Sequence, residues 1–194
     1  MAIKTAPYIP RLLDVQSVLK EKSCFLFGPR QTGKTSLIHH TFKDNEIPFY
    51  NLLDSPTFLK LSRSPHLLKE EIPKGAKIAV IDEIQKMPHL LDQVHLLIEE
   101  RGIHFLLTGS SARKLRRGGV NLLGGRARSR ILHPLIYKEL RSQFDLLRAL
   151  NVGLLPSIYF SNSPDEDLES YASNYLKEEI AAEGLTRNVP AFSR

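Results

Sequence analysis

The fold is decided by a run of eight residues, Gly28-Pro29-Arg30-Gln31-Thr32-Gly33-Lys34-Thr35. The run fits the phosphate-loop pattern G-x-x-x-x-G-K-[ST] at every fixed position. Gly28 and Gly33 allow backbone angles that a side chain forbids, so successive N–H groups can point at phosphate oxygens. Lys34 supplies a cation for the phosphates and Thr35 supplies a hydroxyl for a metal ion. The run therefore predicts a phosphate-binding loop that uses all eight residues.

The sequence on both sides of the loop supports this prediction. Residues 24–27 are a short apolar run of strand type, and residues 36–42 can form a helix that begins at Ser36. The positive end of that helix would face the bound phosphates, so Ser36 is included among the phosphate-binding residues. A strand, a glycine-containing loop and a helix in this order indicate a mononucleotide-binding unit.

Strands alternate with helices along the rest of the chain. Further strands are expected at residues 49–54, 77–83, 104–109 and 130–136, and further helices at residues 12–20, 55–71 with a break near Pro65, 90–101, 137–151 and 165–182. This alternation predicts an α/β fold of the P-loop nucleoside triphosphatase type, with a doubly wound parallel sheet of five strands flanked by helices. Pro134 is expected at an edge or at the end of its strand.

Length and composition set the broad class. The chain has 194 residues, 42% of them hydrophobic, which is enough for one domain with a substantial core. No apolar run approaches the roughly 18 residues that span a membrane, and the first eleven residues contain no apolar signal segment. With a single cysteine, Cys24, a cytoplasmic location is expected. We expect an N-terminal helical segment at 1–20, a core at 21–160 and a C-terminal helical segment at 161–194.

Two adjacent carboxylates follow the apolar strand at residues 77–83. Asp82 and Glu83 would reach the carboxyl edge of the sheet, where ligands of open α/β sheets bind. Asp82 is expected to hold Mg²⁺ together with Thr35. Glu83 is expected to polarise an attacking water molecule. A carboxylate in that role favours hydrolysis of a nucleoside triphosphate over phosphoryl transfer to a metabolite.

Hydroxyl groups follow the strand at residues 104–109. Thr108 and Ser110 are the two candidates to contact both the water molecule and the γ-phosphate. Gly-Ser-Ser is also a common turn and helix cap, so a purely structural role stays open as the alternative.

Positive charge is concentrated near the middle of the chain. The net charge is +6, and residues 101–150 carry 11 basic against 2 acidic side chains. The block contains Arg113, Lys114, Arg116, Arg117, Arg126, Arg128 and Arg130. Three interpretations stay open: a solvated loop, a γ-phosphate contact by Arg126 or Arg128 in the same or a neighbouring subunit, and a DNA or RNA backbone contact. The stretch from Arg113 to Arg130 has no aromatic residue, so stacking on bases is not supported.

Four motifs in this order resemble those of a known family. They are the phosphate loop, Ile-Asp-Glu-Ile-Gln-Lys-Met-Pro at 81–88, Leu-Leu-Thr-Gly-Ser-Ser-Ala at 106–112, and Gly-Gly-Arg at 124–126 followed by Leu-His-Pro-Leu at 132–135. The chain is similar to predicted AAA+-superfamily ATPases of archaea and bacteria, in which a second domain of unknown function usually follows. That second domain is expected to be missing here.

The resemblance implies an AAA-like core that binds ATP with Mg²⁺ and hydrolyses it to ADP. It assigns the γ-phosphate sensor to Thr108 or Ser110, and the arginine finger or sensor to Arg126. A homo-oligomer is possible, and no membrane association is expected. Two alternatives are an ATP-gated interaction module with little turnover and a nucleic-acid-associated ATPase.

Overall fold

The structure is a computed structural model that describes residues 7–43, 47–110, 112, 115 and 122–176. Contacts divide the chain into two compact units. The sheet unit contains the described residues of Leu13–Pro29 and Lys34–Leu132. The helical unit contains those of Met1–Leu12, Arg30–Gly33 and His133–Arg194. The predicted core at residues 21–160 therefore contributes to both units.

The sheet unit is built on five parallel strands in the order β2-β3-β4-β1-β5. The strands are β1 (Ser23–Phe27), β2 (Phe49–Asn51), β3 (Ile78–Asp82), β4 (His104–Gly109) and β5 (Ala127–Ile131). The helices are α1 (Val15–Leu19), α2 (Lys34–Phe42), α3 (Ser55–Arg63), α4 (Leu67–Glu71) and α5 (Leu90–Arg101), with a short 3₁₀ turn at Ile84–Lys86. This arrangement confirms the predicted α/β fold with a five-strand parallel sheet.

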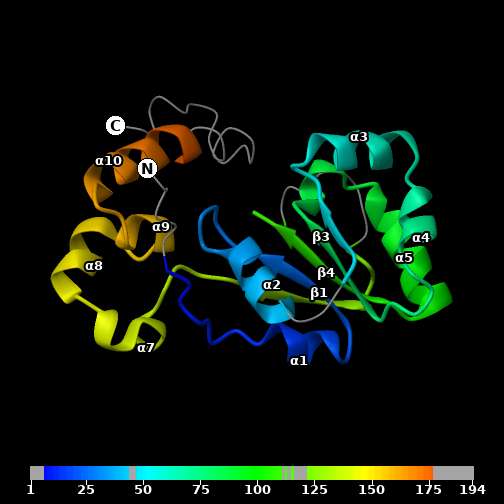
Figure 1. Cartoon of the computed structure of the whole chain (residues 1–194), viewed down its shortest axis with the longest axis horizontal. Helices are drawn as coiled ribbons and strands as arrows, with labels where there is room; N and C mark the ends of the chain where they lie inside the picture. Colours follow the sequence, from blue (N-terminus) through cyan, green and yellow to red (C-terminus); the bar gives the residue numbers. More distant parts are fainter. Residues whose placement is uncertain (1–6, 44–46, 111, 113–114, 116–121, 177–194) are drawn as a thin grey trace. The chain divides into compact units, whose positions relative to one another are not determined.

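Helices cover both faces of the sheet (Figure 1). Alternate strand residues point to opposite faces, so Phe25 and Phe105 enter a core with α3, α4 and α5. Leu26 and Leu106 enter a second core with α1 and α2. This burial on both faces explains why the central strands are continuously apolar in the sequence.

Two strands differ from the prediction. β2 ends at Asn51 because Asp54 begins α3: its carboxylate accepts hydrogen bonds from the N–H (3.0 Å) and the hydroxyl (2.7 Å) of Thr57. β5 was expected at residues 130–136 but runs from Ala127 to Ile131. Its side chains are partly or fully exposed, so it lacks the apolar pattern by which the inner strands are found.

The helical unit contains α7 (Tyr137–Leu140), α8 (Leu146–Val152), α9 (Pro156–Tyr159) and α10 (Pro164–Ser170), with a 3₁₀ turn at Arg141–Gln143 and a π-helical turn at Tyr171–Leu176. The single helix predicted at residues 137–151 is wrong, because Arg141 adopts φ 51° and separates α7 from α8. The short helix α9 was not predicted. Part of the helix predicted at 165–182 lies outside the described residues.

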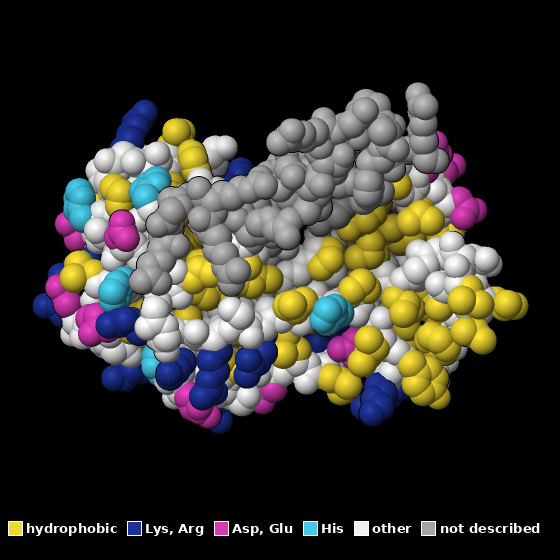
Figure 2. Space-filling view, turned by 180° about the vertical axis from the view of Figure 1, so that it is seen from behind, with side chains coloured by type: hydrophobic (Ala, Val, Ile, Leu, Met, Phe, Trp, Pro, Cys, Tyr) yellow, Lys and Arg dark blue, Asp and Glu magenta, His cyan; other side chains and the backbone are white. Residues whose placement is uncertain are grey.

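Ile9, Leu135, Leu140 and Tyr159 form the small core of the helical unit. Hydrophobic side chains also gather on its surface, as Figure 2 shows. The large apolar residues most exposed in α7 and α8 are Tyr137, Leu146, Leu147 and Leu150. Among the described residues, no helix has the length and apolar character needed to cross a membrane.

Candidate phosphate-binding and catalytic site

The carboxyl ends of three neighbouring strands bring the predicted site together. Gly28 follows β1, Asp82 ends β3, and Thr108 lies near the end of β4, the strand between them. Because all strands are parallel, these ends share one edge of the sheet. The predicted hydroxyl therefore lies between the phosphate-loop strand and the carboxylate strand.

The lysine of the phosphate loop is held by the loop backbone. Lys34 Nζ donates to the carbonyl oxygens of Gly28 at 2.7 Å and Pro29 at 3.0 Å, and Lys34 is only 6% exposed. Lys34, Thr35 and Ser36 form the first turn of α2, whose N-terminal N–H groups favour an anion. The local chemistry thus suits phosphate oxygens.

Glycine is required at position 33 by its backbone angle. Gly33 has φ +88°, and a Cβ built there would meet no atom within 4 Å. The strain of a side chain would therefore come from the left-handed conformation and not from a lack of space. Gln31 also has a positive φ, of +63°.

Asp82 lies between two hydroxyl groups. Thr35 Oγ1 donates to Asp82 Oδ2 at 2.9 Å, and Thr108 Oγ1 donates to Asp82 Oδ1. Asp82 and Thr108 are almost fully buried, at 2% and 0% exposure. The hydroxyl of Thr35 and the carboxylate of Asp82 are hard oxygen donors, the kind that Mg²⁺ prefers, so these residues fit that ion.

Glu83 follows β3 directly and has a left-handed backbone conformation, with φ +63°. Its N–H donates to Thr108 Oγ1 at 3.1 Å, and its carboxylate Oε2 accepts a hydrogen bond from Gln85 Nε2. Thr108 thereby connects Asp82 with the backbone of Glu83. One hydrogen-bonded group at the carboxyl edge of the sheet thus contains Thr35, Asp82, Thr108 and Glu83.

Gln85 was not predicted as a site residue. Its amide oxygen Oε1 is buried and has no hydrogen-bond partner among the described residues. A Cβ built on Gly109 would lie 2.5 Å from this oxygen, so glycine at position 109 makes room for the amide. The sequence did not single out Gln85, because its contact with the side chain of Glu83, two residues earlier, depends on the tight turn between them.

Ser110, the second hydroxyl candidate, is not joined to this group. Its Oγ is buried and has no hydrogen-bond partner within the part of the chain that the structure describes. The structure therefore connects Thr108, and not Ser110, with Asp82 and Glu83.

Arg126 lies away from the site. It precedes Ala127, which pairs with Ser23 at the start of β1, whereas the phosphate loop follows the end of β1. Five residue steps lead from Ser23 to Gly28, roughly 16 Å at the rise of a β-strand. Arg126 Nε donates to Glu99, and this contact lowers the pKa of the Glu99 carboxyl. Within one chain, Arg126 does not reach the phosphate loop.

The rest of the arginine block gives a mixed result. Arg128 Nη2 contacts Glu21 Oε2 at 2.5 Å, so its charge is also paired with a carboxylate. Arg130 donates to the carbonyl of Ser129 at 3.0 Å. The remaining basic residues, Arg113, Lys114, Arg116 and Arg117, lie outside the described residues.

A phosphate loop after β1, carboxylates after β3 and a hydroxyl from the strand between them define a P-loop nucleoside triphosphatase fold. A family model described as an AAA domain matches residues 20–141, which is more than half of the chain. The chain therefore belongs to this AAA domain family.

A solved structure also resembles the chain. It is a Signal Transduction ATPase with Numerous Domains (STAND) protein with a tetratricopeptide repeat sensor from Pyrococcus horikoshii, with 19% identity and a TM-score of 0.43. The match covers 88% of this chain and 29% of that chain, so the present chain spans less than a third of that protein. No curated protein matches the chain.

Proposed function

We propose that this AAA domain binds ATP with Mg²⁺ and hydrolyses it, and that hydrolysis drives a conformational or assembly change. The observation that carries the proposal is the hydrogen-bonded group of Thr35, Asp82, Thr108 and Glu83 beside the phosphate loop. Membership of the AAA family supports ATP as the nucleotide.

Each residue has a role that follows from its position. The N–H groups of the phosphate loop and the ammonium of Lys34 bind the β- and γ-phosphates. Thr35 and Asp82 hold Mg²⁺, which when bound offsets the negative charge of those phosphates. The carboxylate of Glu83 orients a water molecule and accepts its proton as the water attacks the γ-phosphorus, while the bond from that phosphorus to the β–γ bridging oxygen breaks and ADP leaves. Thr108 holds the carboxylate of Asp82 and the backbone of Glu83 in fixed positions relative to each other through its two hydrogen bonds.

Replacing Glu83 tests the proposal. Glu83→Gln keeps the size of the side chain but removes its basicity, so ATP affinity is retained and turnover falls by about 10²-fold or more. The control is Glu100→Gln, the same chemical change at an exposed carboxylate of α5 that pairs with Lys69. Phosphate release with Mg²⁺ and ATP binding are measured for both. Equal turnover in Glu83→Gln and the parent would show that Glu83 is not the base.

A second candidate is an ATP-gated switch with little turnover. One observation favours it: Glu83 and Thr108 are both already engaged, Glu83 by Gln85 and Thr108 by Asp82. In this candidate the Gln85 amide holds the Glu83 carboxylate in an orientation that does not activate water, so turnover stays low. Mixing the protein with a large excess of Mg-ATP, and following both bound ATP and released phosphate over hours, separates the two candidates. ATP that stays bound and uncleaved supports the switch, and multiple turnovers exclude it.

A further inference from the structure

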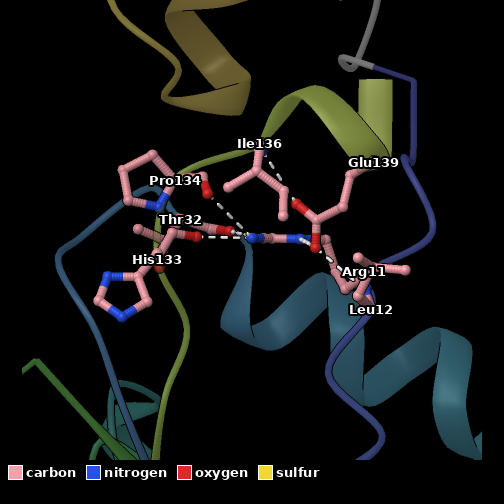
Figure 3. A network of polar contacts seen from close by, with 7 residues as sticks. All are labelled: Arg11, Leu12, Thr32, His133, Pro134, Ile136 and Glu139. Carbon is pink, nitrogen blue, oxygen red and sulfur yellow. Dashed lines mark hydrogen bonds and ion pairs between the residues drawn. The ribbon is translucent and has the colours of Figure 1, made fainter. Parts of the chain in front are cut away.

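An arginine outside the predicted site contacts the phosphate loop through a side chain that is largely shielded from solvent (Figure 3). Arg11 Nη1 donates to the carbonyl oxygen of Thr32 at 2.8 Å. Its Nη2 donates to the carbonyl oxygens of His133 at 2.6 Å and Pro134 at 3.3 Å. All four residues belong to the helical unit. One side chain thus connects the loop with the segment that leads into α7.

Glu139 of α7 holds Arg11 in place. Arg11 Nε and Glu139 Oε1 form an ion pair at 3.1 Å without the alignment of a hydrogen bond, and both side chains are 5% exposed. Glu139 also accepts from the N–H of Leu12 at 3.0 Å and from the N–H of Ile136 at 3.2 Å, where α7 begins. Burying such a pair costs about as much desolvation as its attraction returns, so stability alone does not account for it. The planar guanidinium of Arg11 holds its partners in a fixed arrangement, and we take this positioning as the main effect of the ion pair.

The contact with Thr32 fixes the polarity of the loop backbone. A peptide bond is planar, and in the trans form its C=O and the following N–H point in opposite directions. No described peptide bond is cis. Because the Thr32 carbonyl points at Arg11, the N–H of Gly33 points away from Arg11. A loop that binds phosphate needs such N–H groups directed at the anion.

A second contact holds the middle of the loop. Ser157 Oγ, at the start of α9, donates to Gln31 Oε1 at 2.6 Å. Gln31 adopts a left-handed conformation that only a few non-glycine residues show. The loop residues 30–33 are therefore held at two points by side chains of their own unit.

We propose that Arg11 is a positioning residue of the phosphate loop, and that it transmits phosphate binding at residues 30–33 to α7 through Glu139. The inference rests on the proposed binding of ATP. When phosphate oxygens draw the loop N–H groups toward them, the Thr32 carbonyl is fixed against Arg11. The same guanidinium also bonds His133 and faces Glu139, so the start of α7 is fixed as well.

Arg11→Lys tests this relay. Lysine keeps the positive charge, but a single ammonium cannot reproduce a planar fork that bonds three groups in different directions. Arg101→Lys is the matched control, because Arg101 also donates through one guanidinium to backbone carbonyls, those of Lys69 at 3.2 Å and Ile72 at 3.0 Å. We expect Mg-ADP to bind about tenfold more weakly to Arg11→Lys and with parental affinity to the control, as measured by titration calorimetry.

Hydrogen exchange supplies the readout that a purely structural role would not change. In the parent, saturating Mg-ADP should slow amide exchange at residues 28–36 and also at residues 134–140. In Arg11→Lys, saturating Mg-ADP should still slow exchange at 28–36 and no longer do so at 134–140. Glu139→Gln, which keeps an acceptor oxygen but removes the charge, should show the same loss if Arg11→Lys does not fold.

The outcomes separate the two proposals. Parental affinity together with parental protection at residues 134–140 in both variants would overturn the relay alone. Absence of Mg-ADP binding in the folded parent would overturn the proposed function and the relay with it. Loss of protection at 134–140 in the Arg101→Lys control would also overturn the relay, because the effect would then not depend on Arg11.

Discussion

The side-chain amide of Gln85 donates a hydrogen bond to the carboxylate of Glu83, and its own carbonyl oxygen is buried beside Gly109. Glu83 is the proposed base, so its orientation matters for the reaction. A donor on a carboxylate fixes the position of one of its oxygens. Gln85 is therefore placed to orient Glu83.

Truncating Gln85 tests this relationship. We expect Gln85→Ala to lower kcat by about tenfold and to leave the Kd for ATP unchanged, because Gln85 supports the base and not the phosphate loop. Gln16→Ala is a matched control, since Gln16 also donates through its side-chain amide, to the Thr41 carbonyl at 2.9 Å on the surface. Single-turnover and steady-state phosphate release are measured for each variant. A kcat at or above the parental value would mean that Gln85 does not assist Glu83.

Gly109→Ala should reproduce the effect of Gln85→Ala. The added methyl group would lie 2.5 Å from Gln85 Oε1, so the amide must move away from its present position. We expect kcat to fall by about the same factor, with little further loss in the double variant, because both changes act on the same contact. A double-mutant cycle on kcat measures the coupling. Additive losses from the two substitutions would argue against a shared mechanism.

Removing the hydroxyl of Thr35 should affect the metal ion. In Thr35→Val, Asp82 keeps its contact with Thr108 but loses the 2.9 Å bond from Thr35. We expect the apparent affinity for Mg²⁺ in the presence of ATP to fall by about tenfold or more, whereas Thr35→Ser, which keeps the hydroxyl, stays within about threefold of the parent. A Mg²⁺ titration of ATPase rate gives both values. Equal Mg²⁺ dependence in Thr35→Val and Thr35→Ser would remove Thr35 from the metal site.

If Arg126 contacts a γ-phosphate, the nucleotide must be bound to a neighbouring chain. We expect turnover per chain to rise with protein concentration in the parent and to be lower by at least about tenfold, without that rise, in Arg126→Ala. Lys69→Ala is the control, because Lys69 also pairs with one surface glutamate, Glu100, and is 44% exposed, against 39% for Arg126. Parental turnover in Arg126→Ala at every concentration would exclude Arg126 as an arginine finger.

Burial raises the pKa of the Cys24 thiol from 9.0 to about 11, and the Coulombic effect of Arg130 opposes this rise only in part. The folded protein therefore keeps a proton that the unfolded chain releases near pH 9. The stabilisation from this group is present below pH 9 and disappears as the pH rises through about 11. The free energy of unfolding should thus fall by at most about 3 kcal/mol more in the parent than in Cys24→Ala over that range.

Urea unfolding at pH 8, 9, 10 and 11 measures this difference. The comparison uses the change with pH, so a constant loss from the smaller alanine side chain cancels. Tyr50, whose pKa burial raises to about 12, contributes in the same direction to both proteins. Parallel pH profiles for the two proteins would show that Cys24 does not titrate differently on folding.

The central fold could be predicted because its signals are local. Buried parallel strands leave continuous apolar runs in the sequence, and the phosphate loop has a fixed spacing. β5 was misplaced because an outer strand rich in arginine carries no such run. The break at Arg141 was missed because its positive φ depends on the surrounding structure. Arg11 could not be found from sequence, because its partner His133 lies 122 positions away.

Both outer strands of the described sheet are poor templates for pairing with another molecule. Unpaired N–H and C=O groups along an outer strand invite edge-to-edge association, and proteins limit it with short strands and charged side chains. β2 has only three residues, and β5 carries Arg128 and Arg130. The two arginines interrupt the apolar pattern by which strands are predicted. They also disfavour association of β5 with the edge strand of another molecule at high protein concentration.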